Sequence, residues 1–168
     1  MAKATKTSKN TKLTVLNGDA TAPVGSGPRV IAHICNDIGG WGSGFVVAVS
    51  KRWRQPEADF RAWYKGRHKN DFALGAVRFV EVEEQLWVAN MVGQHTIKAT
   101  KDGPPIRYRA VKEALASVGD FALERGASVH MPRIGCGLAG GTWDRVGPIV
   151  QRQLGARGVE AFVYDFAP

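Results

Sequence analysis

The stretch MPRIGCGLAGGTWDRV, residues 131–146, raises the main question about this fold. It follows a run of β propensity (127–134) and leads into a segment whose apolar residues recur at helical spacing. Gly135, Gly137 and Gly140 fit the pattern G-x-G-x-x-G of a dinucleotide-binding Rossmann turn. Backbone N–H groups at such a strand-to-helix turn favour an anion, and glycine lets a phosphate come close. The stretch therefore predicts a phosphate-binding turn, in a Rossmann domain or in another fold.

The position of this turn argues against a Rossmann domain. A Rossmann fingerprint opens its domain and needs several more βα units after it. Here we expect one helix and one strand (159–166) to follow, and Glu160, at about the right spacing for a ribose-binding acid, has no later unit to place it. A Walker A loop is also excluded, because no glycine turn is followed by Gly-Lys-Ser or Gly-Lys-Thr.

A second glycine-rich turn lies at residues 36–45, NDIGGWGSGF. It follows an apolar run at 29–35 and precedes residues 45–53, which we expect to be helical because Lys51 and Arg52 close the segment. In an α/β sheet both turns would lie at the carboxyl ends of strands, where ligands bind. We expect the two turns to hold a diphosphate between them. The alternative is that these glycines only permit tight turns.

The rest of the chain alternates between expected strands and helices. Further strands are expected at 13–16, 76–82 and 86–92, and further helices at 57–66 and in the segment that Gly126 ends. The run 86–92 is nearly all apolar, which indicates a central strand covered on both faces. The pattern predicts an α/β fold, a three-layer α/β/α sandwich with a mixed, mainly parallel sheet of about six strands. We expect one domain over residues 13–168.

Composition excludes several classes of protein. No apolar run approaches the roughly 18 residues that a membrane span needs, and the first residues lack the apolar segment of a secretory signal. Two cysteines, Cys35 and Cys136, are too few for a disulfide scaffold and match no zinc motif. We therefore expect a cytoplasmic protein with no metal, no cofactor and no membrane partner.

The net charge of +8 is unevenly distributed. Residues 1–12 contain four lysines and no acid, so residues 13–168 carry the other four net positive charges. We expect residues 1–12 to be a disordered basic tail that aids solubility or makes a weak contact with nucleic acid. The remaining positive charge suits an anionic ligand.

Three motifs, in order along the chain, resemble those of the macrodomain family of ADP-ribose-binding modules. Residues 17–21 (NGDAT) resemble the family's early Gly-Asp-Ile-Thr turn. Residues 33–36 (HICN), followed by 39–44 (GGWGSG), resemble its first phosphate loop, and 131–138 (MPRIGCGL) resemble its second. The resemblance covers about residues 13–166.

The resemblance implies ADP-ribose as the ligand, free or attached to a protein or nucleic acid. It implies that Asp19 accepts a hydrogen bond from the adenine amino group, that Asn36 contacts the distal ribose, and that Tyr164 or Phe166 packs on the adenine. The alternatives are that Asp19 only shapes a turn or caps a helix, that Asn36 only forms an Asx turn, and that the aromatic residue belongs to the core. The full set implied to bind substrate is Gly18, Asp19, Ala20, Asn36, Gly40, Gly42, Gly44, Phe45, Ile134, Gly135, Cys136, Gly137, Leu138 and Phe166.

The resemblance also bears on catalysis. The motif at 131–138 is similar to that of a branch that removes ADP-ribose from carboxylates or nucleic acid with a lysine and an aspartate. Here Ala139 stands at the aspartate position, and the lysine position falls near Gly93 or Gln94, with Lys98 and Lys101 further along the same loop. In the ADP-ribose-1″-phosphate phosphatase branch, a histidine at the position of His33 is implicated in removing the terminal phosphate.

For the catalytic pair we take His33 with Asp37 as the residue that positions water; Gln94 and His95 are the other candidate partners. The alternatives are a buried, structurally satisfied His33, or Cys136 as a nucleophile beside it. Three functions stay open: a hydrolase of an ADP-ribose derivative, a non-catalytic ADP-ribose reader, and a nucleic-acid-binding protein that uses its basic tail.

Overall fold

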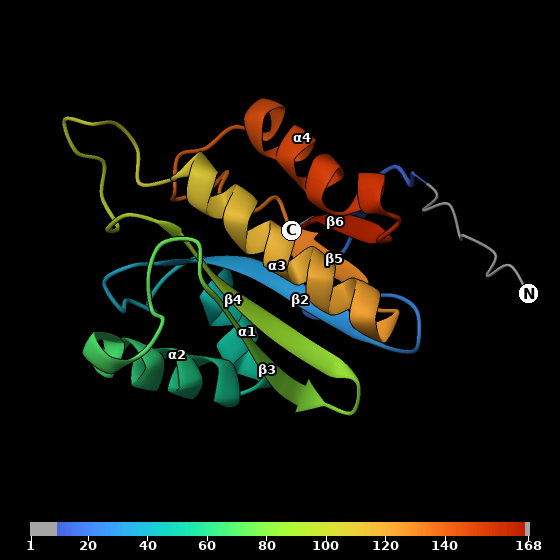
Figure 1. Ribbon diagram of the computed structural model, residues 1–168, viewed down its shortest axis with the longest axis horizontal. Helices are drawn as coiled ribbons and strands as arrows, with labels where there is room; N and C mark the ends of the chain where they lie inside the picture. The colour runs from blue at the N-terminus through green and yellow to red at the C-terminus, as the bar shows by residue number, and fades with distance from the viewer. Residues whose placement is uncertain (1–9, 167–168) are drawn as a thin grey trace, which may run out of the picture.

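Six strands form one mixed sheet between two layers of helices in the computed structural model, which describes residues 10–166 (Figure 1). The strand order is β1-β6-β5-β2-β4-β3, and every neighbouring pair is parallel except the antiparallel pair β3 and β4. The strands are β1 (Thr14–Asn17), β2 (Arg29–Asn36), β3 (Val77–Glu83), β4 (Leu86–Gln94), β5 (Ser128–Pro132) and β6 (Ala161–Asp165). The predicted α/β sandwich is confirmed, including its six strands and its mainly parallel sheet.

The helices divide into two pairs, one on each face of the sheet (Figure 1). The helices are α1 (Phe45–Arg52), α2 (Gln55–Lys65), α3 (Tyr108–Arg125) and α4 (Trp143–Gln153), with short 3-10 turns η1 (Arg67–Lys69) and η2 (Gly155–Arg157). One hydrophobic core lies between the sheet and α3 with α4, and a second, rich in aromatic residues, lies between the sheet and α1 with α2. The helices α3 and α4 each bury one apolar stripe, as the helical spacing of their apolar residues predicted.

The central strand β2 supplies both cores, because successive side chains of a strand point to opposite faces. Val30 and Ala32 face the α3 and α4 side, whereas Ile31 and Cys35 face the α1 and α2 side. The same alternation places His33 on the α1 side, where its ring packs against aromatic neighbours.

One edge of the sheet gathers the loops that carry chemistry. Strands β2, β4 and β5 run parallel to one another, so their carboxyl ends lie at the same edge. The loop after β2 is the first glycine-rich loop (residues 37–44), and the loop after β5 is the second (residues 133–142). The β4–α3 loop (residues 95–107) is joined to both, since Thr96 N donates to Asp37 Oδ1 and Ile106 N donates to Ala139 O.

The N-terminal segment makes its first described contacts before residue 13. Thr11 N donates to Gly155 O at 2.9 Å, and Gln151 Nε2 donates to Thr11 O at 2.8 Å. Most of the expected basic tail, residues 1–9, lies outside the described residues. No helix within residues 10–166 combines the length and apolar character that crossing a bilayer requires.

Candidate functional site

A cleft of about 530 Å³ opens at the edge of the sheet where β2, β4 and β5 end. The first glycine-rich loop and the start of α1 form one wall, and the second glycine-rich loop forms another. Residues 94, 97 and 98 come from the end of β4 and the loop after it. The expected residues that line the cleft are His33, Asn36, Gly40, Gly42, Gly44, Phe45, Ile134, Gly135, Gly137 and Leu138.

The charge of the cleft suits an anion. Among the described residues, no Asp or Glu lines its wall, whereas Lys98 and Arg133 do. The guanidinium of Arg133 donates to both carboxylate oxygens of Asp165, at 2.5 and 2.8 Å. The first N–H groups of α1 have no partner within their helix and add positive potential at this end.

Asn36 shapes the first glycine-rich loop. Its Oδ1 accepts from Ile38 N at 3.1 Å and Gly40 N at 2.8 Å, and its Nδ2 donates to Gly40 O at 2.9 Å. This is the Asx-turn arrangement that the sequence left open as the alternative. Asn36 nevertheless lines the cleft, so its second Nδ2 proton is available on that wall.

His33 is buried, with 1% of its surface exposed, and it is one of the residues that line the cleft. Asn90 donates from Nδ2 to Pro56 O at 3.1 Å, which turns its Oδ1 toward His33 Nε2 at 2.5 Å. His33 therefore carries its proton on Nε2 and leaves Nδ1 unprotonated. Trp41 and Phe45 pack on the ring, with centroids 5.4 and 5.6 Å away.

The environment keeps His33 neutral. Burial lowers the pKa of the imidazole to about 4, although the hydrogen bond with Asn90 works in the opposite direction. Cys35 Sγ lies 4.0 Å from the unprotonated Nδ1 and is a weak donor to it. A neutral imidazole can accept a proton at Nδ1, but a pKa of about 4 makes it a weak base near neutral pH.

Asp37 lies beside the cleft rather than on its wall. Its Oδ1 accepts from Thr96 N at 2.8 Å, and its Oδ2 lies 2.6 Å from His95 Nδ1. The carboxylate thus joins the first glycine-rich loop to the β4–α3 loop. In this structure it anchors a loop, and its predicted role in positioning water stays a prediction.

The residues expected at the adenine lie outside the cleft. Gly18, Asp19, Ala20 and Phe166 do not line it. Asp19 Oδ1 accepts from the backbone N and hydroxyl of Thr21 at 2.8 and 2.7 Å. Partial burial raises the pKa of Asp19, but those hydrogen bonds and the charge of Arg52 outweigh it and leave the pKa below its ordinary value.

The two aromatic candidates for the adenine differ in burial. Phe166 is 75% exposed at the end of β6. Tyr164 is a core residue with 3% exposure, and its hydroxyl bonds to Val24 N and His130 Nδ1 at 2.9 and 2.7 Å. Of the two, Phe166 alone presents a surface to a ligand.

Neither cysteine has the environment of a nucleophile. Cys136 does not line the cleft, and its Sγ donates to Ile134 O at 3.4 Å. Burial raises the pKa of both thiols, so both stay protonated near neutral pH. Within residues 10–166, no group of three or more His, Cys, Asp or Glu side chains is arranged to hold a metal ion.

Comparison with known proteins assigns the fold to a family. No family model matches the chain. The solved structure of a macrodomain protein from Streptomyces coelicolor is 55% identical with a TM-score of 0.83, over 93% of this chain and 100% of that one. This chain belongs to the macrodomain family. A Bacteroides thetaiotaomicron protein of unknown function is 54% identical with a TM-score of 0.89, over 92% of this chain and 98% of that one.

More distant relatives extend the comparison of this macrodomain. Mouse chromodomain-helicase-DNA-binding protein 1-like is 29% identical over 166 residues, 94% of this chain, but the chain spans only 18% of that protein. An ADP-ribose 1″-phosphate phosphatase from Candida albicans is 22% identical over 136 residues, 77% of this chain and 85% of that protein. Thermosipho africanus DarTG, solved in complex with ADP-ribose, shares the fold with a TM-score of 0.66 at 18% identity, over 83% of this chain and 38% of that one.

The macrodomain cleft also contains residues that motif analysis did not select. Trp41, Ile97, Lys98 and Arg133 line it. Trp41 and Arg133 stand within the two quoted motifs, so their position in the loops was a usable signal. Lys98 lies in a polar loop without a motif, and only the tertiary structure brings it to the cleft.

Proposed function

We propose that this macrodomain binds ADP-ribose and hydrolyses an ADP-ribose derivative, either ADP-ribose-1″-phosphate or an ADP-ribosyl adduct of a protein or nucleic acid. One observation carries the binding proposal. Two glycine-rich loops face one another across a single cleft that no described carboxylate lines. Such loops present backbone N–H groups to a diphosphate at the carboxyl edge of the sheet. The complex of DarTG with ADP-ribose and the similarity to a phosphatase support the choice of nucleotide.

We propose one orientation of ADP-ribose along the cleft. We place the diphosphate between residues 40–45 and 134–138, and the distal ribose beside Asn36 and Gln94, at the ends of β2 and β4. The adenine then extends beyond the cleft toward Asp19, Ala20 and Phe166. Glycine at position 137 leaves open space, because no atom lies within 4 Å of where its Cβ would be.

The hydrolytic part of the proposal rests on His33. His33 lines the cleft and its Nδ1 is unprotonated, so we propose that Nδ1 accepts a proton from water in place of its weak contact with the Cys35 thiol. The attack of that water would break the bond between the distal ribose and its substituent. The low pKa of the imidazole predicts modest catalysis rather than a fast enzyme.

A non-catalytic reader is the second candidate, and specific observations favour it. His33 Nε2 is engaged by Asn90, and both oxygens of Asp37 are engaged by the β4–α3 loop. Ala139 and Gln94 cannot provide the aspartate and lysine pair of one hydrolytic branch. A reader needs only the diphosphate and ribose contacts.

Calorimetry with ADP-ribose tests the binding proposal through Gly137. Replacing Gly137 with Glu should lower affinity at least about 100-fold, since a carboxylate would enter the diphosphate site and oppose its charge. Gly137→Gln is the matched control of nearly equal size, and it should lose less affinity because it adds no charge. Equal, wild-type affinity in both variants would overturn the placement of the diphosphate.

Product release separates the enzyme from the reader. The wild-type chain is incubated with ADP-ribose-1″-phosphate, and separately with a glutamate-linked ADP-ribosyl peptide. Release of phosphate or ADP-ribose that His33→Ala abolishes, with ADP-ribose binding retained, supports the hydrolase. Binding without release of either product supports the reader. A contact between nucleic acid and the basic tail is a separate proposal that deletion of residues 1–12 would test.

A further inference from the structure

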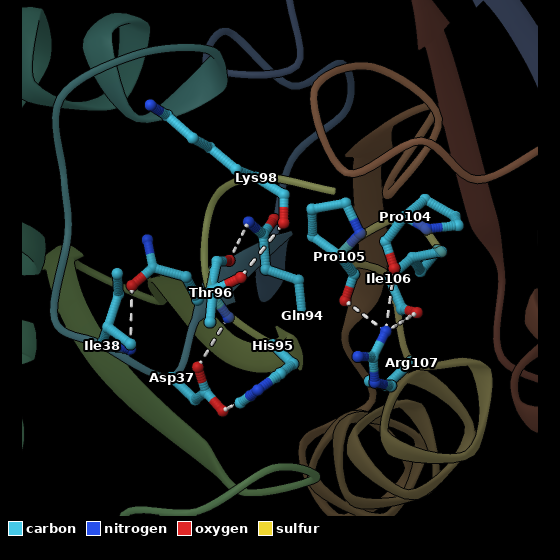
Figure 2. Close-up of polar contacts among 11 residues, drawn as sticks. Asp37, Ile38, Gln94, His95, Thr96, Lys98, Pro104, Pro105, Ile106 and Arg107 are labelled. Carbon is cyan, nitrogen blue, oxygen red and sulfur yellow. Dashed lines mark hydrogen bonds and ion pairs between the residues drawn. The ribbon is translucent and has the colours of Figure 1, made fainter. Parts of the chain in front are cut away.

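The β4–α3 loop contains a turn in an unusual backbone conformation. Thr96 has a φ of +57°, in the left-handed region that a β-branched residue rarely adopts. Three hydrogen bonds hold it there (Figure 2). Thr96 N donates to Asp37 Oδ1 at 2.8 Å, Gln94 Nε2 donates to Thr96 O at 2.9 Å, and Thr96 Oγ1 donates to Lys98 O at 3.2 Å.

The same loop is fixed at its other end. His95 N donates to Pro105 O at 2.8 Å, and Arg107 donates to the carbonyl oxygens of Pro104, Pro105 and Ile106 (Figure 2). The base of the loop is therefore closed by hydrogen bonds on both sides. The backbone position of Lys98 follows from this closure and from the turn at Thr96.

Lys98 is the cation that this turn presents to the cleft. Its side chain lines the cleft and, in Figure 2, extends away from the hydrogen-bonded turn. Arg133, the other cation on the wall, is paired with Asp165. Lys98 forms no ion pair with any of residues 10–166, so its charge is available to a ligand.

The position of Lys98 indicates which part of a ligand it meets. In the sheet, Asn36 of β2 pairs with Gln94 of β4, and Lys98 follows Gln94 by one short turn. We have placed the distal ribose at these two residues, whereas the diphosphate has its own donors in the glycine-rich loops. Resting on that proposed function, we propose that Lys98 recognises an anionic substituent on the distal ribose, and that Asp37 positions it by holding the turn at Thr96.

Binding measurements on two ligands test the role of Lys98. The probes are ADP-ribose and a non-hydrolysable phosphonate analogue of ADP-ribose-1″-phosphate, each titrated into the whole chain by calorimetry. Lys98→Gln should weaken binding of the phosphonate about tenfold and that of ADP-ribose less than about twofold, because one charge-assisted contact is lost. Lys101→Gln, an exposed lysine of the same loop that does not line the cleft, should change neither affinity.

The outcomes distinguish this inference from the function on which it rests. Equal weakening of both ligands in Lys98→Gln would assign Lys98 to the diphosphate, and unchanged affinities would show no contact; either result overturns the inference while ADP-ribose binding stands. Failure of the wild-type chain to bind ADP-ribose at all would instead overturn the proposed function.

A second pair of variants tests the positioning role of Asp37. Asp37→Ala should reduce the preference for the phosphonate over ADP-ribose to a similar extent as Lys98→Gln. Thr96 N–H then loses its acceptor, so the turn that positions Lys98 is no longer held. Asp37→Asn keeps an oxygen acceptor and should retain most of the preference. A preference that survives intact in Asp37→Ala would show that the turn does not depend on this carboxylate.

Discussion

At the scale of single residues, the buried polar groups behind the cleft form a closed set of hydrogen bonds. Asn90, with no exposed surface, links His33 of β2 to the carbonyl of Pro56 in α2. Among the described residues, no buried side-chain nitrogen or oxygen lacks a partner. An unpaired buried polar group costs about 1–3 kcal/mol. The loss of the Asn90 side chain would leave two such groups, His33 Nε2 and Pro56 O, without a partner.

Asn90→Leu is a direct test of this set. Leucine is similar in size but leaves His33 Nε2–H and Pro56 O without partners, so we expect the free energy of unfolding to fall by about 2–4 kcal/mol. Urea denaturation of both proteins measures it. Gln55→Leu, at an exposed position of α2, is the control and should change stability by less than about 0.5 kcal/mol. A wild-type stability for Asn90→Leu would contradict the prediction.

At the scale of elements, α2 determines the shape of the first glycine-rich loop. Gly39 has a φ of +75°, and a Cβ there would lie 2.3 Å from a ring carbon of Tyr64 in α2. Arg61, also in α2, donates to Gly39 O at 3.5 Å. A side chain at position 39 would both strain the backbone and push the loop away from the helix.

Gly39→Ala should therefore destabilise the fold by about 2–4 kcal/mol, from backbone strain and overpacking together. Gly42→Ala in the same loop is the matched control, since its φ is not in the left-handed region and a Cβ would meet no atom within 4 Å. Thermal and urea unfolding of the two variants compare them directly. Equal free energies of unfolding of the two variants would show that the loop accommodates a Cβ beside Tyr64 without loss of stability.

At the scale of the whole molecule, two buried histidines on the same face of the sheet, His33 of β2 and His130 of β5, link stability to pH. Burial lowers the pKa of His33 to about 4, and burial together with the charge of Arg29 lowers the pKa of His130 to about 4. His130 Nδ1 lies 2.7 Å from the Tyr164 hydroxyl, which accepts from Val24 N, and His130 Nε2 lies 2.8 Å from Ser128 Oγ. A protonated imidazole at either position would be a buried charge, so the folded protein favours the neutral form of both rings.

The sign of the pH dependence follows from these pKa values. Between pH 6.5 and 4 the unfolded chain binds more protons than the folded one, so the free energy of unfolding falls as the pH falls through this window. We expect each histidine to contribute a loss of up to about 3 kcal/mol by pH 4, and none above pH 7. Urea denaturation across this range measures it. His130→Gln, which can still hydrogen-bond with Tyr164, should show about half the loss of unfolding free energy. If the free energy of unfolding of this variant falls with pH as steeply as that of the wild type, His130 does not contribute to the pH dependence.

The extent to which the sequence predicted the site differs between residues. Gly42, Gly44, Gly135 and Gly137 stand in local strand-to-turn-to-helix patterns, and they do line the cleft. Asp37 stands in the same kind of pattern, but its carboxylate contacts His95 and Thr96 of the β4–α3 loop, which lie 58 and 59 residues later in the chain. Asp19 and Phe166 were selected through resemblance, and their contact with adenine stays a prediction.

The sequence by itself determined the order of strands and helices, the mixed α/β architecture and the two glycine-rich loops. These features depend on hydrophobic period and turn chemistry, which act between residues close in the chain. Only the tertiary structure decided that Asn90 is the partner of His33, that Asp37 holds Thr96, and that Lys98 reaches the cleft. Those contacts depend on β4 lying beside β2, and that neighbour relation is set by packing of the whole sheet rather than by any local pattern.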